Sequence, residues 1–229
     1  MLAYWALNAT QDPSGALLTS RRAAGLIVAA AVLIDLASRD TIHVTAAVIT
    51  VTVPDDPHDV TAHADSCHPA AAAARTGTAP PAAGARLDRL SADVLEQIRQ
   101  DPGLSTAEVV EALADDIRER LARHLIRAGT AKPGPRPWWR RQPLSAVLGD
   151  PPAGGKSPVV KIVCQQRLTT DERALLHVIA GSSLRPMVLG HIRDTSVHRA
   201  LGPIESLDPR HQPLVNGAVT VLRDMALAR

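Results

Sequence analysis

The hydrophobic and polar positions of the chain follow two different periods in its first quarter. The stretch from Thr19 or Ser20 to about Ser38 is apolar on nearly every side. This predicts a central buried helix with Thr19 or Ser20 as its N-cap. Residues 41–53 are rich in β-branched side chains that alternate with others, so they predict a hairpin that ends at Pro54. A core helix followed by two short strands is therefore expected.

Amphipathic patterns return in the second half of the chain. Ser105 and Glu108 have the spacing of a capping box at the start of a helix, and Thr169 and Glu172 have the same spacing at the start of another. Apolar residues then recur every four positions from Leu113 to Leu125, which predicts one buried stripe, and Gly129 is the expected stop. Further helices are predicted at residues 1–8, 89–100, 169–181, 184–201 and 211–229, whereas residues 159–166 fit either a strand or a helix.

These patterns together predict a mainly α-helical fold in a single globular domain over residues 1–229. A central cluster of hydrophobic helices would be surrounded by amphipathic helices, with one or two short β-hairpins. Residues 55–85 contain mostly Asp, His, Ala, Pro and Gly without periodicity, and they predict a flexible loop. The core must be aliphatic, because the chain has no phenylalanine and aromatic residues make up only 2% of it.

Charge and cysteine content narrow the functional classes. The chain has 25 basic and 23 acidic residues, a balance that does not indicate a nucleic-acid partner. Cys67 and Cys164 lie too far apart for a disulfide framework or a zinc motif, which favours a reducing compartment. The most apolar run, residues 23–34, is shorter than the roughly 20 residues that span a bilayer, and no export signal is visible. A cytoplasmic location is expected.

The sequence has no motif typical of catalysis or of cofactor binding. Residues 154–157 read Gly-Gly-Lys-Ser, but the phosphate-loop pattern requires glycine where Asp150 stands, and Pro158 disfavours the helix that should follow. The loop at residues 55–68 contains His, Cys and Asp side chains in a spacing that matches no closed zinc site. We therefore predict no catalytic residue, no cofactor and no metal site.

Two tryptophans stand directly beside two arginines in a proline-rich stretch. Tryptophan prefers the boundary between water and hydrocarbon, and arginine makes bidentate contacts to phosphate. The sequence Trp138-Trp139-Arg140-Arg141 therefore predicts a shallow anchor on an anionic lipid surface. The alternative interpretation is that one tryptophan covers the helix that ends at Ala128 and that the arginines are simply solvated.

Four stretches, in this order, resemble the Golgi phosphoprotein 3 family. They are DPSGALLTS (12–20), AAVLIDLASRDTIHV (30–44), IRERLARHLIRAG (117–129) and WWRRQPL (138–144). The family's bacterial members are numerous in actinomycetes, and the richness in Ala and Arg is typical of high-GC bacteria. The resemblance implies a mostly helical fold with a protruding β-hairpin. Eukaryotic members bind phosphatidylinositol 4-phosphate and act as adaptors that sort membrane enzymes.

The resemblance carries over to individual positions only in part. The family's lipid-binding tryptophan falls on Ser20 and its first arginine on Ala29, so both are replaced in this chain. A later arginine is kept as Arg118, but the position of its arginine partner holds Asp115. The hairpin is retained in kind at residues 138–141.

We expect a non-catalytic, peripheral membrane protein of adaptor type that binds phosphoinositide or other anionic phospholipid headgroups at the inner face of the membrane. The expected lipid-binding residues are Trp138, Trp139, Arg140, Arg141, Arg118, Arg21 and Arg22. A protein partner is also expected of an adaptor. Two alternatives stay open: a helical scaffold recruited as an enzyme or small-molecule binder in bacterial specialised metabolism, and a protein-interaction module without lipid.

Overall fold

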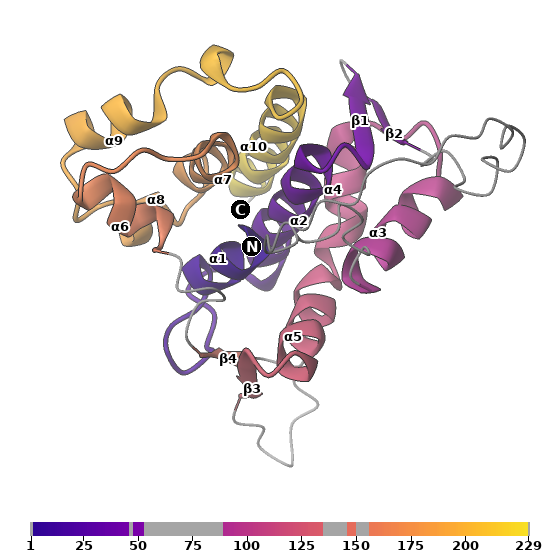
Figure 1. The fold of residues 1–229 in the computed structure, drawn as a ribbon, viewed down its shortest axis with the longest axis horizontal. Helices are drawn as coiled ribbons and strands as arrows, with labels where there is room; N and C mark the ends of the chain where they lie inside the picture. The colour runs from indigo at the N-terminus through magenta and orange to yellow at the C-terminus, as the bar shows by residue number, and fades with distance from the viewer. Residues whose placement is uncertain (1, 46–47, 53–88, 135–145, 150–155, 229) are drawn as a thin grey trace, which may run out of the picture.

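Helices make up most of the structure, a computed structural model that describes residues 2–45, 48–52, 89–134, 146–149 and 156–228 (Figure 1). The α-helices are α1 (Leu2–Ala9), α2 (Arg21–Ser38), α3 (Arg89–Gln100), α4 (Thr106–Ala114), α5 (Ile117–Arg127), α6 (Pro158–Val163), α7 (Thr170–Ala180), α8 (Arg185–Val188), α9 (Asp194–Leu201) and α10 (Gln212–Leu227). A short 3-10 helix, η3, spans Ile204–Ser206. The mainly α-helical, single-domain architecture expected from the sequence is confirmed.

Helix α2 is the centre of the fold. Helices α1, α4, α5, α7 and α10 all pack against it, and its residues from Ala23 to Ile34 are buried (Figure 1). Ser20 caps its first turn, where the hydroxyl accepts a hydrogen bond from the Ala23 amide at 3.2 Å. Many of its side chains are alanine, which allows neighbouring helices to approach closely. The predicted central hydrophobic helix is therefore confirmed.

One close approach is at Gly25, where α2 crosses the carboxyl end of α4. A Cβ atom at this position would lie 1.9 Å from the Ala114 carbonyl oxygen, so only glycine fits without a backbone shift. Helix α4 ends at Ala114, and α5 restarts at Ile117.

The sequence predicts a single helix with one apolar stripe across this region. In the structure this helix is divided at Asp115 and Asp116. Aspartate is a poor residue for a helix interior and competes for backbone hydrogen bonds, which accounts for a break at this pair. The apolar stripe from Leu113 to Leu125 is nevertheless buried on both sides of the break.

The structure also defines the ends of several other helices. Both predicted capping boxes form, at Ser105–Glu108 and Thr169–Glu172. Most of the ambiguous segment 159–166 belongs to helix α6, and Ser157 caps the start of this helix. The single helix predicted for residues 184–201 is divided into α8 and α9.

The strands form two antiparallel pairs, β1 (Ile42–Thr45) with β2 (Val48–Val51) and β3 (Ala131–Pro133) with β4 (Ala146–Leu148). The predicted first hairpin is thus confirmed. The second pair lies beyond the carboxyl end of α5 and is fixed to the start of the chain (Figure 1). The Tyr4 hydroxyl donates to the Gly149 carbonyl at 2.6 Å, and the Gln11 amide donates to the Ala146 carbonyl at 2.8 Å.

Two of the predicted features fall on residues that the structure does not describe. They are the loop at 55–85, with its His and Asp side chains, and the Trp-Trp-Arg-Arg stretch at 138–141. In the described part of the chain, none of the helices combines the length and the apolar character that a bilayer crossing requires.

The crossing at Gly25 leads to a stability prediction. We expect Gly25→Ala to lower the free energy of unfolding by about 2 kcal/mol or more, because overpacking against backbone exceeds the roughly 1 kcal/mol gained in helix propensity. Gly217→Ala, in α10, should lower the free energy of unfolding by less. A Cβ atom at this position would lie 3.0 Å from a methyl group of the Thr106 side chain, which can move more easily than backbone. Urea unfolding followed by circular dichroism measures both. A Gly25→Ala protein as stable as the wild type would contradict the close crossing.

Candidate functional site

The start of α2 lies against the junction of α4 and α5, and charged side chains gather there. The Arg21 guanidinium donates to the Glu119 carboxylate at 2.5 Å, which links α2 to α5. Arg22 forms an ion pair with Glu111 of α4. The two arginine side chains are 53% and 55% exposed, so these ion pairs are in contact with solvent and contribute little to stability.

Arg118 lies beside this surface, but in a very different environment. It is only 4% exposed, and its Nε atom has no hydrogen-bond partner among the described residues. Burial lowers the pKa of its guanidinium, as does the nearby charge of Arg21, whereas Glu119 acts in the opposite direction. Even so, an arginine keeps its proton near neutral pH. The junction therefore contains a buried positive charge without full compensation.

The break between α4 and α5 determines this environment. Because α5 restarts at Ile117, Arg118 belongs to the first turn of the helix, where the helix dipole favours a negative charge. Asp116, two residues before Arg118, does not pair with it. Asp116 instead accepts from Arg120 one turn later, at 2.8 Å from Nε, with a second nitrogen of the same guanidinium at 2.6 Å. An anion at this helix start would meet both the dipole and Arg118.

The structure brings together three of the seven residues predicted to bind lipid, namely Arg21, Arg22 and Arg118. The other four, at positions 138–141, lie outside the described residues. The strands on either side of them are described, and Pro133 pairs with Ala146 across the ladder. The chain therefore leaves β3 and returns to β4 at one place.

The partners of these arginines could not be predicted from the sequence. Glu111 and Glu119 come from two helices that meet α2 only in the folded chain, so no spacing along the sequence connects them to Arg21 and Arg22. Arg118 shares an alternating run of charges with its neighbours, and such a run usually indicates a solvated surface. Its burial depends on where α5 begins.

A separate apolar cavity of about 250 Å³ lies among α1, α6, α7 and α8, and its described lining includes none of these arginines. Trp5 and Leu176 contribute to its walls, together with Val160 of α6 and Val188 of α8. The Trp5 indole nitrogen is buried and has no hydrogen-bond partner. No titratable side chain is among the described residues that line this cavity, so its chemistry suits binding of an uncharged molecule.

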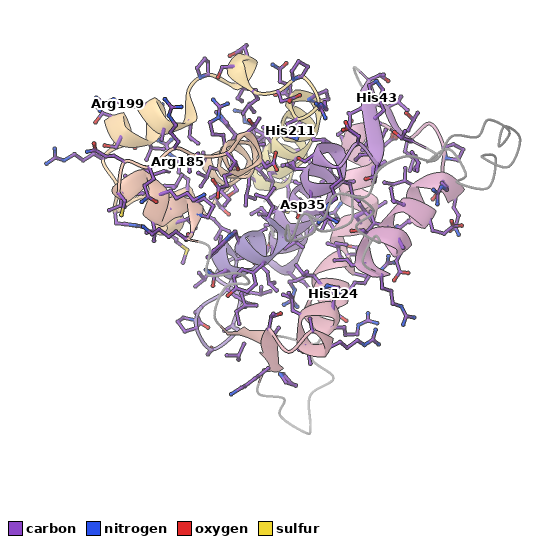
Figure 2. All side chains as sticks on the ribbon, in the orientation of Figure 1. Asp35, His43, His124, Arg185, Arg199 and His211 are labelled. Atoms are coloured by element: carbon purple, nitrogen blue, oxygen red, sulfur yellow. The ribbon has the colours of Figure 1, made fainter. Side chains whose placement is uncertain are left out.

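The buried histidine has a structural role. His211, at the start of α10, lies 3.1 Å from the Ser38 hydroxyl at the end of α2, through its Nε2 atom (Figure 2). Burial lowers its pKa, and the nearby Asp171 and Asp208 oppose this shift. Its contact with Ser38 connects two core helices, and the Ser38 hydroxyl also donates to the Ile34 carbonyl within α2 at 2.8 Å. Within the described ranges no cluster of His, Cys, Asp and Glu could hold a metal ion.

Comparison with family models gives one match. The model described as Golgi phosphoprotein 3 (GPP34) matches residues 5–222, nearly the whole chain. The chain belongs to this family. The match to the Golgi phosphoprotein 3 family extends from α1 into α10 and includes Arg21, Arg22 and Arg118. Comparison with curated proteins finds no similar protein, and comparison with solved structures finds none either.

The buried charge of Arg118 predicts that this side chain lowers the stability of this Golgi phosphoprotein 3 family member while it serves binding. We expect Arg118→Met to raise the free energy of unfolding by about 1 kcal/mol or more, because methionine fills similar space without a buried charge. The control Arg199→Met, exposed on α9, should change it by less than about 0.5 kcal/mol. Urea unfolding measures both. Destabilisation by Arg118→Met would mean that the guanidinium makes a stabilising interaction within the chain.

Proposed function

We propose that this protein is a non-catalytic, peripheral membrane adaptor that binds the headgroups of anionic phospholipids. The observation that supports this most directly is Arg118, a cation that is almost fully buried at a helix start and lacks a hydrogen bond at Nε. A headgroup phosphate would supply the missing negative charge and the missing acceptor oxygen. Membership of the Golgi phosphoprotein 3 family agrees with such a role.

Access to Arg118 requires a rearrangement at the surface of the junction. In the structure, Arg21 is bound to Glu119, and both of these charges act electrostatically on Arg118. In our proposal a phosphate replaces Glu119 as the partner of Arg21 and reaches Arg118 behind it. Since exposed ion pairs are weak, this exchange costs little. Arg22, on the same turn of α2, exchanges Glu111 in the same way.

The hairpin supplies the second contact of the proposal. Strand β4 accepts a hydrogen bond from Gln11, and Gly149, which follows it, accepts one from Tyr4, so the two paired strands provide a fixed base for the segment between them. Its two tryptophans would enter the interfacial region, while Arg140 and Arg141 would meet phosphates. Each basic residue near an anionic bilayer contributes about 1 kcal/mol, and a single shallow anchor gives reversible binding.

The base of the hairpin and the junction are connected through the chain itself. The segment between α1 and α2 binds β4 through Gln11 at its beginning and caps α2 with Ser20 at its end. We therefore place both contacts in one Golgi phosphoprotein 3-like domain that spans residues 1–229. Its proposed location is the cytoplasm and the inner face of the membrane.

Sedimentation with vesicles tests this function. The wild type should sediment with vesicles of phosphatidylcholine and phosphatidylglycerol in low salt, more strongly when phosphatidylinositol 4-phosphate is added, and should be released at about 1 M salt. The double variant Trp138→Ala with Arg140→Ala should lose most of this binding, because both parts of the anchor are reduced. Arg118→Met should retain the salt-dependent surface contact and lose the response to phosphatidylinositol 4-phosphate.

Arg199→Ala is the matched control for charge, because Arg199 is exposed on α9, well away from α5 (Figure 2). It should sediment like the wild type. Equal sedimentation of the wild type and the hairpin double variant would remove the hairpin from the function. Equal binding to neutral and anionic vesicles would mean that electrostatic contacts do not contribute to membrane binding.

A second candidate function, binding of a small apolar molecule, is favoured by the cavity beside Trp5. The cavity has about 250 Å³ of space, and most of its lining is aliphatic or aromatic. Apolar cavities of this kind bind small apolar ligands without a charged partner. The absence of titratable groups among its described lining residues favours binding over catalysis, so the enzyme alternative gains nothing from this site.

Thermal unfolding in the presence of indole tests this second function. Indole is small enough for the cavity, and binding to the native state alone should raise the melting temperature by a few degrees as its concentration exceeds Kd. Val188→Trp should abolish the response, because the new side chain fills the cavity. Val163→Trp, on the exposed side of α6, should retain it. A wild-type protein that does not respond to indole would argue against this function.

A further inference from the structure

A small hollow between α3 and α5 concentrates positive charge away from the α2 junction. It has a volume of about 110 Å³ and lies between the first turn of α3 and one face of α5. Its lining consists of Arg89, Leu90, Asp93, Arg120, Arg123, His124 and Arg127. The three arginines of α5 are spaced three and four residues apart, so they project from one face of the helix.

The charges in this hollow are not balanced. Arg120 is neutralised by Asp116, and its remaining nitrogen donates to the Gln97 side chain at 3.2 Å. The other three arginines, at positions 89, 123 and 127, have no ion pair or side-chain hydrogen bond with any described residue. Asp93 is the single carboxylate among the described lining residues. Among the described residues, the three unpaired arginines set against Asp93 leave the hollow with a net charge of +2.

This arrangement is unfavourable without a ligand. Like charges three or four residues apart on a helix repel each other and destabilise it by a few tenths of a kcal/mol per pair. The chain as a whole is nearly neutral, with 25 basic and 23 acidic residues, so the cluster is not a consequence of overall composition. The first turn of α3 also contributes the positive end of its helix dipole.

The hollow also adjoins a deeper space. A second cavity, of about 160 Å³, shares Leu90 and His124 with it, and its lining also includes Tyr4 and Asp35. Its lining is mixed, with aliphatic residues such as Val32 beside these polar groups. A ligand with a charged group at the arginines would therefore find room for a less polar part beyond Leu90.

We propose that the hollow between α3 and α5 binds a phosphomonoester group, either of a soluble molecule or of a lipid headgroup. A phosphomonoester carries close to two negative charges at neutral pH, which matches the net charge of the hollow. Its oxygens accept bidentate hydrogen bonds from guanidinium groups, here those of Arg123 and Arg127. Arg118 is not among the lining residues, so this site is separate from the junction and does not depend on the function proposed above.

Isothermal titration calorimetry in low salt provides the test, with inorganic phosphate and glycerol 3-phosphate as soluble probes. The wild type should bind glycerol 3-phosphate, and Arg123→Gln with Arg127→Gln should weaken binding at least tenfold. Both arginines are exposed, so this double variant should keep the wild-type melting temperature. The double variant should cause the same loss of affinity when it is made in an Arg118→Met background, which separates this site from the α2 junction.

The matched control removes the same two charges elsewhere, as Arg199→Gln with Arg223→Gln, both exposed on α9 and α10. It should bind like the wild type. Sedimentation with vesicles that contain phosphatidic acid distinguishes the sources: binding to glycerol 3-phosphate supports a soluble phosphomonoester, and binding to the vesicles alone, lost in the Arg123 and Arg127 double variant, supports a headgroup. The proposal is overturned if neither probe binds, or if the control loses as much affinity as the double variant.

Discussion

The close crossing of α2 and α4 is the contact on which the rest of the structure depends. Helix α2 can approach the Ala114 carbonyl because Gly25 has no side chain, and α4 ends at this crossing. Helix α5 restarts after Asp115 and Asp116, which places Arg118 in its first turn, where it is buried near the start of α2. Packing in the core and this local break together determine the electrostatics of the candidate site.

Local sequence signals predicted much of this fold. The apolar α2, the capping boxes at Ser105 and Thr169 and the β1–β2 pair could be located because caps and periodicity act over a few residues. The division between α4 and α5 could not, since the buried stripe continues through it without a change of period. The acidic partners of Arg21 and Arg22 could not be located either, because they depend on contacts of α2 with helices that are distant in sequence.

The arginines illustrate why a candidate site is harder to predict than a fold. Arg21, Arg118 and Arg123 look alike in the sequence, each in a run of charged residues. In the structure the first is paired with a carboxylate, the second is buried, and the third is exposed beside other cations. Arginine count alone therefore says little about anion binding. The state of each guanidinium is decided by which carboxylates the folding brings within reach.

The hydrogen bonds from Tyr4 and Gln11 to the β4 region have a consequence for any work with shortened or tagged forms of this protein. These two side chains connect the amino-terminal segment to strand β4 and to Gly149, which follows it. Trimming the first helix would remove one of those attachments together with the indole of Trp5. A truncation at that end would then disturb hairpin geometry and the neighbouring apolar cavity at once, although neither lies near it in sequence.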